Sequence, residues 1–283
     1  MKQLEFVKMV ASGNDFVVIA PAFAKASAGA SKSFKHKLAN SKLSSFAKEI
    51  CDRNLGVGAD GLLVIEPSKK ADFKMRIFNP DGSEAQMCGN GARCVALYAK
   101  ENKIVDGEMR IDTLSGIIEA KVSGDKVKIK MQDPKDIKLD FDLPVEGKDY
   151  KVSFVNTGVP HAVLFIQELE SFDVKRSGRT IRYHENFAPK GTNVNFVELE
   201  KGNSIKVRTY ERGVEDETLA CGTGVTASAI VSAVSKGLKS PVSCLTKSGE
   251  KLKVYFDRAG DNFKNVYLEG SAKIVFYGQF LIK

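Results

Sequence analysis

The chain is poor in the residues from which metal and redox centres are built. Its 283 residues include three histidines, His36, His161 and His184, and five cysteines, with no C-x-x-C pair. The histidines form no paired pattern with the cysteines, which argues against a zinc site. The missing C-x-x-C pair argues against a dithiol oxidoreductase. We therefore expect no metal.

Long apolar runs are also missing. No segment approaches the length that crosses a bilayer, and the first residues lack the basic stretch and apolar core of a secretory signal. An odd number of cysteines spread over a long chain is not a disulfide framework. These absences predict a protein of the reducing cytoplasm, with no membrane partner.

Positive charge is in excess but is not concentrated. The formal net charge is +8, yet the lysines are scattered beside nearly as many acids, without a dense basic run or an RNA-binding aromatic motif. We therefore expect no nucleic acid partner, whereas a small acidic or zwitterionic ligand is compatible with the charge. An apolar fraction of 43% and a charged fraction of 28% are typical of a globular protein.

Two short segments of the chain are versions of one another. Both read E-x-x-x-C-G-x-G, at 84–91 and at 217–224. Each precedes small and apolar residues with helical periodicity, so Cys88 and Cys221 are predicted to lie where helices begin. The glycines after each cysteine let a ligand approach the backbone N–H groups of the helix end.

Further segments recur in the same order in the two halves. Segments 12–19, 56–65 and 75–79 are answered by 152–166, 191–199 and 207–211. The strands expected within these halves include residues 73–78 and 196–199. This order predicts an α+β fold of two pseudo-symmetric domains that arose by duplication, each a barrel-like sheet around a central helix, with the active site in the cleft between them. The expected domains are 1–131 plus 272–283, and 132–271.

An Ala/Ser/Lys-rich segment at 21–47 interrupts the first half. Its composition predicts a surface insertion that runs into a helix at about 41–53. We assign it no chemistry.

A pair of thiols at helix ends is suited to inverting a carbon stereocentre. A helix N-terminus favours the thiolate, and inversion by proton transfer needs a base on one face of the carbon and an acid on the other. A cysteine can also be simply a small apolar residue of the core, and we interpret Cys51, Cys94 and Cys244 in this way. A Cys-His nucleophile using His161 stays open as an alternative, although it leaves one of the two repeated thiols unexplained.

At these residues the sequence resembles the diaminopimelate epimerases. The resemblance covers nearly the whole chain and is carried by NPDGSE at 79–84, MCGNGARC at 87–94, NTGVPH at 156–161, GTNVNF at 191–196, YERG at 210–213 and ACGTG at 220–224. It implies epimerisation of LL-diaminopimelate to meso-diaminopimelate, on the route to lysine and peptidoglycan, without pyridoxal phosphate or another cofactor. It also implies a homodimer.

The resemblance assigns roles to particular residues. Cys88 and Cys221 are implied as the catalytic acid and base, with His161 and Glu211 beside the reacting centre. The residues implied to bind substrate are Asn14, Asn79, Asn156, Asn193, Glu211 and Arg212, with backbone N–H groups of Gly89, Asn90, Gly222 and Thr223 receiving the reacting carboxylate.

The residues taken alone leave other interpretations open. Asn14 and Asn79 are more typical of turns than of a binding site, and Glu211 with Arg212 could form an ordinary surface pair. Two other functions also stay open: a racemase of proline or hydroxyproline type on the same scaffold, and a catalytically silent amino-acid-binding protein.

Overall fold

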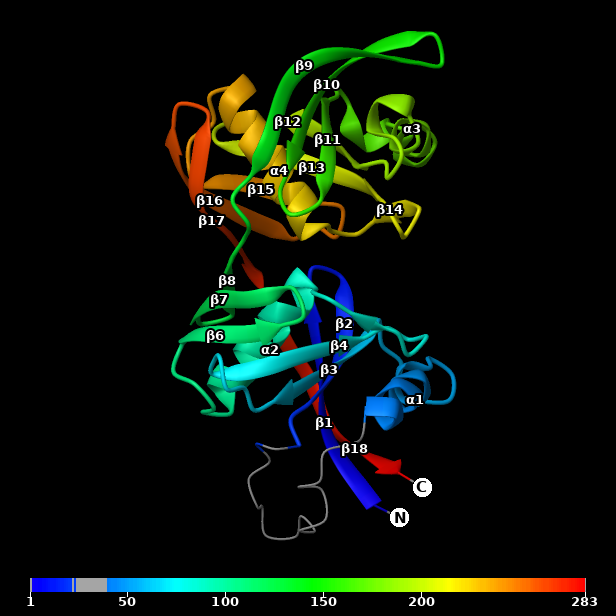
Figure 1. Cartoon of the computed structure of the whole chain (residues 1–283), viewed down its shortest axis with the longest axis vertical. Helices are drawn as coiled ribbons and strands as arrows, with labels where there is room; N and C mark the ends of the chain where they lie inside the picture. Colours follow the sequence, from blue (N-terminus) through cyan, green and yellow to red (C-terminus); the bar gives the residue numbers. More distant parts are fainter. Residues whose placement is uncertain (1, 22, 24–39, 283) are drawn as a thin grey trace. The chain divides into compact units, whose positions relative to one another are not determined.

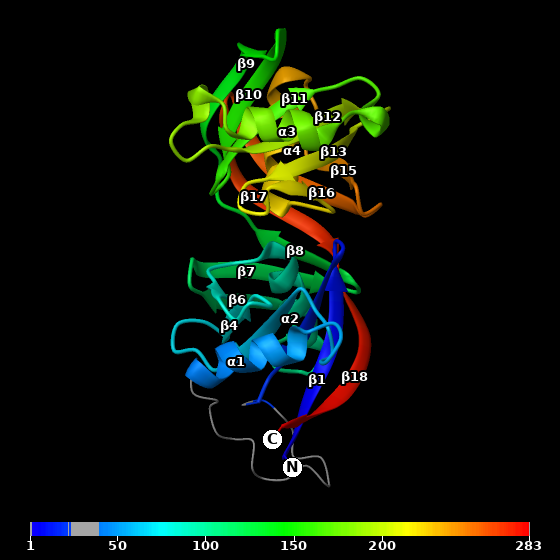
Figure 2. The same cartoon turned by 90° about the vertical axis from the view of Figure 1, so that its right-hand side faces the viewer.

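A computed structural model of the chain describes residues 2–21, 23 and 40–282 (Figures 1 and 2). The chain divides into two compact units, unit 1 with residues 1–129 and 271–283, and unit 2 with residues 130–270. Most of the segment at 21–47 lies outside the described residues, but the helix predicted at its end is present. No helix in the described part of the chain is both long and apolar enough to cross a membrane.

Unit 1 is built from strands and two helices. Its strands are β1 (Lys2–Ala11), β2 (Asn14–Ile19), β3 (Gly61–Glu66), β4 (Phe73–Phe78), β5 (Glu84–Ala85), β6 (Glu108–Thr113), β7 (Gly116–Ser123), most of β8 (Lys126–Lys130) and β18 (Lys273–Ile282). Its helices are α1 (Asn40–Cys51) and α2 (Gly89–Glu101). The C-terminal strand β18 belongs to this unit, where it pairs with β1.

Unit 2 contains the middle of the chain. Its strands are β9 (Lys135–Val145), β10 (Lys148–Asn156), β11 (Pro160–Phe165), β12 (Asn193–Leu199), β13 (Ser204–Glu211), β14 (Asp216–Thr218), β15 (Val242–Thr246), β16 (Lys251–Ala259) and most of β17 (Asn262–Ser271). Its helices are α3 (Val174–Arg182) and α4 (Gly222–Ser235), with short 3₁₀ turns η2 (Leu169–Ser171) and η3 (Glu185–Phe187).

The two units share one pairing scheme. In unit 1, β1 pairs antiparallel with β2 and β18, β2 runs parallel to β3, and β4 pairs with β3, β5 and β6. In unit 2, β10 pairs antiparallel with β11 and β9, β11 runs parallel to β12, and β13 pairs with β12, β14 and β15. Strands β10 to β13 thus repeat β1 to β4, with β9 in the place of β18.

The long helix of each unit is enclosed by strands. Helix α2 contacts β1, β2, β3, β4, β7 and β18, and α4 contacts β10, β11, β12, β13, β15 and β16. Every residue from Asn90 to Leu97 in α2 and from Gly224 to Ala233 in α4 is buried. A helix buried on all sides needs small or apolar residues all round, which explains these Ala- and Val-rich sequences. The predicted α+β fold, a strand-rich layer around one helix, is confirmed.

Several predicted elements differ from the structure, most clearly in unit 2. Strand β12 begins at Asn193, earlier than the predicted start at residue 196. Strand β9 and helix α3 were not predicted at all. The early start of β12 matters for the site, because Asn193 and Asn195, which the sequence places in a strand-like run, are part of the strand itself.

Candidate functional site

Cys88 is the N-cap residue of α2. Its backbone is extended, with φ −143° and ψ 120°, and its Sγ accepts a hydrogen bond from the N–H of Gly91 at 3.4 Å. Gly89 and Asn90 form the start of the first turn, where backbone N–H groups have no partner inside the helix. The prediction that Cys88 lies where a helix begins is confirmed, and its side chain is half-buried.

Cys221 occupies the same place in unit 2, as the N-cap residue of α4. Its backbone is also extended, with φ −115° and ψ 109°, and the residue is buried. Its Sγ lies 3.4 Å from the hydroxyl of Thr223, and the hydroxyl of Thr157 donates to the carbonyl oxygen of Thr223 at 3.1 Å. The first turn of α4, which begins at Gly222, is therefore tied to the connection between β10 and β11.

The environment of Cys221 favours the protonated thiol. Burial first, and then the carboxylate of Glu211, raise the pKa of Cys221 to about 12, against a smaller opposite effect of Thr223. Burial also raises the pKa of Glu211, although hydrogen bonds with Thr218 and then with the Cys221 thiol oppose this. Glu211 and Cys221 therefore form a neighbouring thiol and carboxyl group between which a proton can move.

An arginine–glutamate ion pair holds the segment that leads to each cysteine. On β4, Arg76 donates to both carboxylate oxygens of Glu84, at 2.7 and 2.8 Å. On β13, Arg208 does the same to Glu217, at 2.6 and 2.9 Å. Each glutamate is the first residue of the E-x-x-x-C-G-x-G segment. Since a bidentate pair fixes orientation as well as distance, these pairs set where each segment starts.

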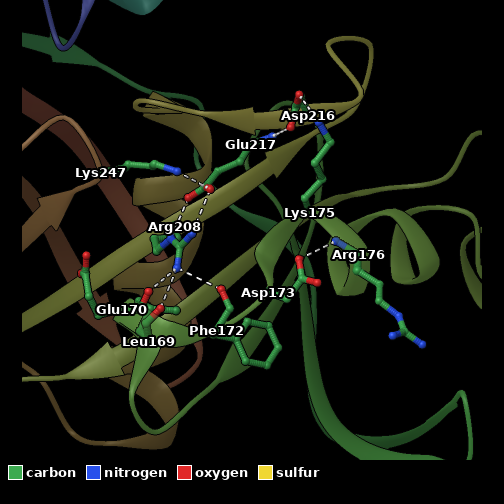
Figure 3. A network of polar contacts seen from close by, with 10 residues as sticks. All are labelled: Leu169, Glu170, Phe172, Asp173, Lys175, Arg176, Arg208, Asp216, Glu217 and Lys247. Atoms are coloured by element: carbon green, nitrogen blue, oxygen red, sulfur yellow. Dashed lines mark hydrogen bonds and ion pairs between the residues drawn. The ribbon is translucent and has the colours of Figure 1, made fainter.

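Arg208 also forms hydrogen bonds with backbone carbonyl groups near it (Figure 3). Its Nη1 donates to three carbonyl oxygens, those of Leu169, Glu170 and Phe172, at 2.7, 3.2 and 3.0 Å. Lys247 forms a second ion pair with Glu217. Burial works to raise the pKa of Glu217, but the hydrogen bonds from Arg208 and Lys247 outweigh it and lower that pKa. Glu217 therefore stays ionised although it is largely buried.

A chain of hydrogen bonds connects Asn14 and Asn90 in unit 1. Asn90 Nδ2 donates to Asn14 Oδ1 at 2.7 Å. Asn14 Nδ2 donates to the carboxylate of Asp60 at 2.9 Å, and Arg93 Nη2 donates to Asn90 Oδ1 at 2.7 Å. A carboxylate only accepts and a guanidinium only donates, so these charged ends fix both amides in one orientation. Asp60 and Arg93, which were not predicted, thus hold two residues that were.

Ion pairs support this series of hydrogen bonds. Asp15 pairs with Lys8 at 2.7 Å and with Arg53 at 2.8 Å, and Arg53 also pairs with Asp60 at 2.7 Å. Burial opposes the charge on Asp15, but its hydrogen bonds with Arg53 and Lys8 hold the pKa of that carboxyl well below its usual range.

His161 lies on β11 and is fully buried. On β12, Asn195 places Nδ2 3.0 Å from His161 Nδ1 and donates to the carbonyl oxygen of Ala162 at 3.0 Å. Asn195 Oδ1 accepts from the hydroxyl of Thr209 at 2.9 Å. Burial, and then the positive charge of Arg212, lower the pKa of His161 to about 3. The imidazole is therefore neutral near pH 7.

Asn193 holds the backbone at Arg212. Its Oδ1 accepts from the N–H of Arg212 at 2.8 Å, and its Nδ2 donates to the carbonyl oxygen of Pro160 at 3.1 Å. The guanidinium of Arg212 makes long contacts, 3.5 and 3.4 Å, with the carbonyl oxygens of Lys190 and Gly191. With five donors on the group, these two contacts leave capacity to bind an anion.

Asn79 and Asn156 each make a contact within a turn. Asn79 follows β4 and donates to the hydroxyl of Ser83 at 2.9 Å. Asn156 ends β10 and accepts from the N–H of Gly158 at 3.0 Å. The turn-forming role described from the sequence for Asn79 accounts for its contact, and the contact of Asn156 is of the same kind. The binding role of both residues remains a prediction.

The remaining cysteines, Cys51, Cys94 and Cys244, are buried. Burial raises the pKa of Cys51 to about 11 and raises that of Cys244 still further. These three cysteines lie outside the two C-G-x-G motifs, and their burial agrees with the role of small apolar core residues. Within residues 2–21, 23 and 40–282, no three His, Cys, Asp or Glu side chains group as metal ligands do.

Solved structures of other proteins share this fold. A phenazine biosynthesis protein of the PhzF family from Bacillus anthracis superposes with a TM-score of 0.74 at 16% identity and covers 100% of both chains. A hydroxyproline epimerase from Agrobacterium vitis gives 0.66 at 16% identity and covers 98% of this chain and 92% of that one. At such identity the likeness concerns the fold alone.

Sequence relatives are much closer. A family model described as diaminopimelate epimerase matches residues 6–137 and 153–275. The diaminopimelate epimerase of Aquifex aeolicus is 47% identical over 282 residues, which cover 98% of this chain and 97% of that protein. The enzyme of the same name from a Hydrogenobaculum species is 42% identical over 281 residues, 96% of each chain. The chain therefore belongs to the diaminopimelate epimerase family.

Proposed function

We propose that this protein converts LL-2,6-diaminopimelate into meso-diaminopimelate by moving the proton of one α-carbon, without pyridoxal phosphate or another cofactor. One observation carries the proposal. Cys88 and Cys221 are the N-cap residues of the buried central helices of two equivalent units, in a chain of the diaminopimelate epimerase family. In this role the protein serves the synthesis of lysine and of peptidoglycan.

The two thiols exchange roles during the reaction. A thiolate on one face of the α-carbon takes the α-proton, and the electron pair of the broken C–H bond is shared with the substrate carboxylate. The thiol on the opposite face then gives its proton to the carbon. The thiolate ends as a thiol and the thiol as a thiolate, so the step balances without an oxidant or a reductant.

Backbone groups stabilise the charge that develops on the substrate. In the intermediate, the carboxylate next to the reacting carbon carries additional negative charge, which first-turn N–H groups bind well. We assign this role to the N–H groups of Gly89, Asn90, Gly222 and Thr223.

Glu211 completes the acid–base chemistry of unit 2. Because the pKa of Cys221 is raised to about 12, this residue enters the reaction as the thiol, the proton donor. In the reverse direction it must act as a base, so it first passes its proton to Glu211, whose own pKa is raised by burial. Glu211 therefore supports Cys221 rather than meeting the α-proton itself.

The distal end of the substrate distinguishes diaminopimelate from proline-type amino acids. We assign its carboxylate to Arg212, whose backbone Asn193 holds in place, since a guanidinium binds a carboxylate through two parallel hydrogen bonds. The amides of Asn14, Asn79 and Asn156 are assigned to the distal ammonium and carboxylate, because an amide can both donate and accept.

We further propose that the protein is a cytoplasmic homodimer. Four large apolar side chains of β18 are 45 to 67% exposed, Val275, Phe276, Tyr277 and Leu281. Large apolar side chains exposed along one strand suit an interface with a second copy. Reduced, working thiols favour the cytoplasm. Sedimentation should show a dimer that Tyr277→Lys weakens, and a wild-type monomer at micromolar concentration would contradict the proposal.

The activity is tested by incubation with LL-diaminopimelate in deuterated water without added cofactor. We expect deuterium at the α-carbon and meso product by NMR and chiral chromatography, and loss of net epimerisation in both Cys88→Ala and Cys221→Ala. Reaction with L-proline or hydroxyproline instead would favour the racemase alternative. Substrate protection of the thiols against alkylation without any turnover would favour the silent binding protein.

A further inference from the structure

Asn195 is a fully buried amide whose orientation is dictated by its neighbours. Its Nδ2 lies 3.0 Å from the carbonyl oxygen of Ala162, and its Oδ1 lies 2.9 Å from the hydroxyl of Thr209. A carbonyl oxygen can only accept, so the amide nitrogen must face Ala162 and the hydroxyl must donate to Oδ1. The opposite orientation would place two acceptors against one another.

The second N–H of this amide decides where His161 carries its proton. Asn195 Nδ2 lies 3.0 Å from His161 Nδ1. Because Nδ2 can only donate, Nδ1 must offer its lone pair, and the one proton of the neutral imidazole lies on Nε2. Nε2 is buried and has no hydrogen-bond partner within the part of the chain that the structure describes. A buried donor without an acceptor is unfavourable, which indicates an acceptor that arrives with a ligand.

The cluster lies directly beneath the cysteine-bearing end of α4. A Cβ on Gly224 would lie 2.3 Å from Asn195 Oδ1 and 3.2 Å from Thr209 Oγ1. The second glycine of the C-G-x-G motif is therefore required for close contact with this amide. A substitution at Asn195 therefore affects both His161 and helix α4, whose N-cap residue is Cys221.

Unit 1 shows what the same scaffold holds at these positions. The strand registers of the two units make three positions equivalent: Phe16 to His161, Leu63 to Asn195 and Ile77 to Thr209. All three side chains of unit 1 are apolar and buried. The fold therefore does not need polar residues there, and because burying polar groups is costly, the cluster of unit 2 calls for a chemical reason.

We propose that Asn195, held by Thr209, is a positioning residue that fixes His161 as the neutral Nε2–H tautomer, so that His161 donates a hydrogen bond to a carboxylate of the substrate. Arg212 is near enough to influence His161, and we have assigned a substrate carboxylate to it. The identity of the acceptor rests on the proposed function, whereas the tautomer does not.

This assignment changes the role expected of His161. A neutral ring with Nδ1 occupied by Asn195 and a proton on Nε2 cannot accept a hydrogen bond from the substrate ammonium. Nor can it take the α-proton. His161 therefore acts as a fixed donor, and Cys88 and Cys221 with Glu211 carry the proton transfers.

The tautomer is measured on the whole protein, without substrate, by NMR of protein labelled with ¹⁵N-histidine. The chain has three histidines, so the spectrum of His161→Gln identifies the His161 signals. We expect Nε2 to show the shift of a protonated nitrogen and Nδ1 that of a bare one, unchanged from pH 8 down to about 5 because the pKa is lowered to about 3. A protonated Nδ1 in the wild-type protein would overturn the inference.

Asn195→Asp and Asn195→Leu separate positioning from packing. A carboxylate at 195 attracts a proton to Nδ1 and raises the pKa of His161. Above that raised pKa, the proton stays on Nδ1 and Nε2 loses its donor. We therefore expect kcat/KM of Asn195→Asp to fall with rising pH along a limb that the wild type lacks. Asn195→Leu, which copies Leu63, should give a mixture of tautomers and no new titration. The same pH profile in Asn195→Asp as in the wild type would overturn the inference.

A variant pair at His161 tests the donor itself. Gln reaches about as far as Nε2 and carries N–H donors, whereas Leu has none. We expect His161→Gln to keep kcat/KM within about tenfold of the wild type and His161→Leu to lose roughly 100-fold, as when a preorganised donor is removed. Equal losses would overturn the donor role. An inactive wild type with the Nε2–H tautomer would refute the proposed function, and an active one with the other tautomer would refute this inference alone.

Discussion

Arg208→Met is the substitution for which the structure predicts the largest local effect. Arg208 is the hub of the contacts drawn in Figure 3, and its side chain is only 17% exposed. The substitution keeps the length of the aliphatic stem but removes every donor. Glu217, 9% exposed, then keeps Lys247 as its ion-pair partner among the contacts in the figure. Three backbone carbonyl oxygens lose their donor as well.

The expected loss of unfolding free energy is about 4 kcal/mol. Removing one partner of a buried ion pair costs roughly 3–5 kcal/mol. Lys247 lowers this figure because it still neutralises Glu217, whereas the carbonyl groups raise it by about 1 kcal/mol, since water reaches them in part. The two corrections nearly cancel.

Arg176→Met provides a matched control in the same unit. Arg176 pairs with Glu146 at 2.9 Å, but the two side chains are 71% and 49% exposed. An exposed pair contributes less than about 1 kcal/mol. The same change of residue type thus separates the buried contact from the loss of a positive charge.

Urea unfolding followed by circular dichroism measures both variants, since the chain has no tryptophan. A chain with two units need not unfold in one step, so hydrogen exchange of peptides from β13 to α4 locates the loss in unit 2. Equal destabilisation by the two substitutions would refute the reasoning. The double variant Arg208→Met with Glu217→Leu should lose less unfolding free energy than the sum of its two single variants, because replacing both partners by apolar residues removes the unpaired charge. A loss equal to the full sum would also refute the reasoning.

Three further predictions follow from single contacts. Gly224→Ala should lower the unfolding free energy by about 1–3 kcal/mol, because its methyl group would lie 2.3 Å from Asn195 Oδ1. In Gly91→Ala the new methyl group would lie 3.0 Å from a methyl group of Leu63, which can turn away. This variant should therefore lose less unfolding free energy in the same urea assay. Alkylation of Cys221 by iodoacetamide, followed by mass spectrometry, should accelerate about tenfold per pH unit from pH 7 to 9, because only the thiolate reacts and the pKa is about 12; a plateau in this range would contradict the raised pKa. The carboxylate of Asp15 has a lowered pKa in the folded protein, so it stabilises above about pH 4 and this stability is lost as the pH falls further; Asp15→Asn should therefore be less stable than the wild type at pH 7, with the difference shrinking at pH 3.

The sequence predicts best those elements whose apolar residues face a single core. Strand β4 has the bounds predicted for it, Phe73–Phe78, because its buried positions are apolar or paired. Strand β9 was missed although apolar and polar residues alternate along it from Ile137 to Val145, which is the pattern of a strand with one buried face. Its buried residues are Leu143 and Val145, at the end of the strand. Helix α3 escaped because it reads VKRSGRTIR, with a glycine in its middle. That glycine, Gly178, has a tertiary reason: a Cβ there would lie 2.4 Å from Tyr210 Cβ.

The residues of the candidate site likewise divide into those with a local signal in the sequence and those without one. Cys88 and Cys221 could be predicted at helix ends, since glycine before small apolar residues is a local signal that occurs twice. Asn195 could not be assigned from sequence. An asparagine in a strand-like run predicts a bend or a ligand contact equally well, and the register that brings it to His161 is a tertiary property. Asp60 was missed for a similar reason, because the parallel pairing of β2 with β3 brings it to Asn14, which lies 46 residues earlier in the sequence.

The duplication makes the differences between the halves informative. Strand β4 is followed by Asn79 and the equivalent strand β13 ends at Glu211, which raises the pKa of Cys221. A phenylalanine likewise stands in unit 1 where unit 2 has His161. Because the scaffold and the C-G-x-G motif are shared, these substitutions cannot be demands of the fold. They place ionisable and hydrogen-bonding side chains in unit 2, whereas the thiol of Cys88 in unit 1 depends on the N-terminus of its helix. Two thiols of the same origin thereby have different surroundings, which suits the proposed reaction, in which one thiol takes a proton from the α-carbon while the other gives one.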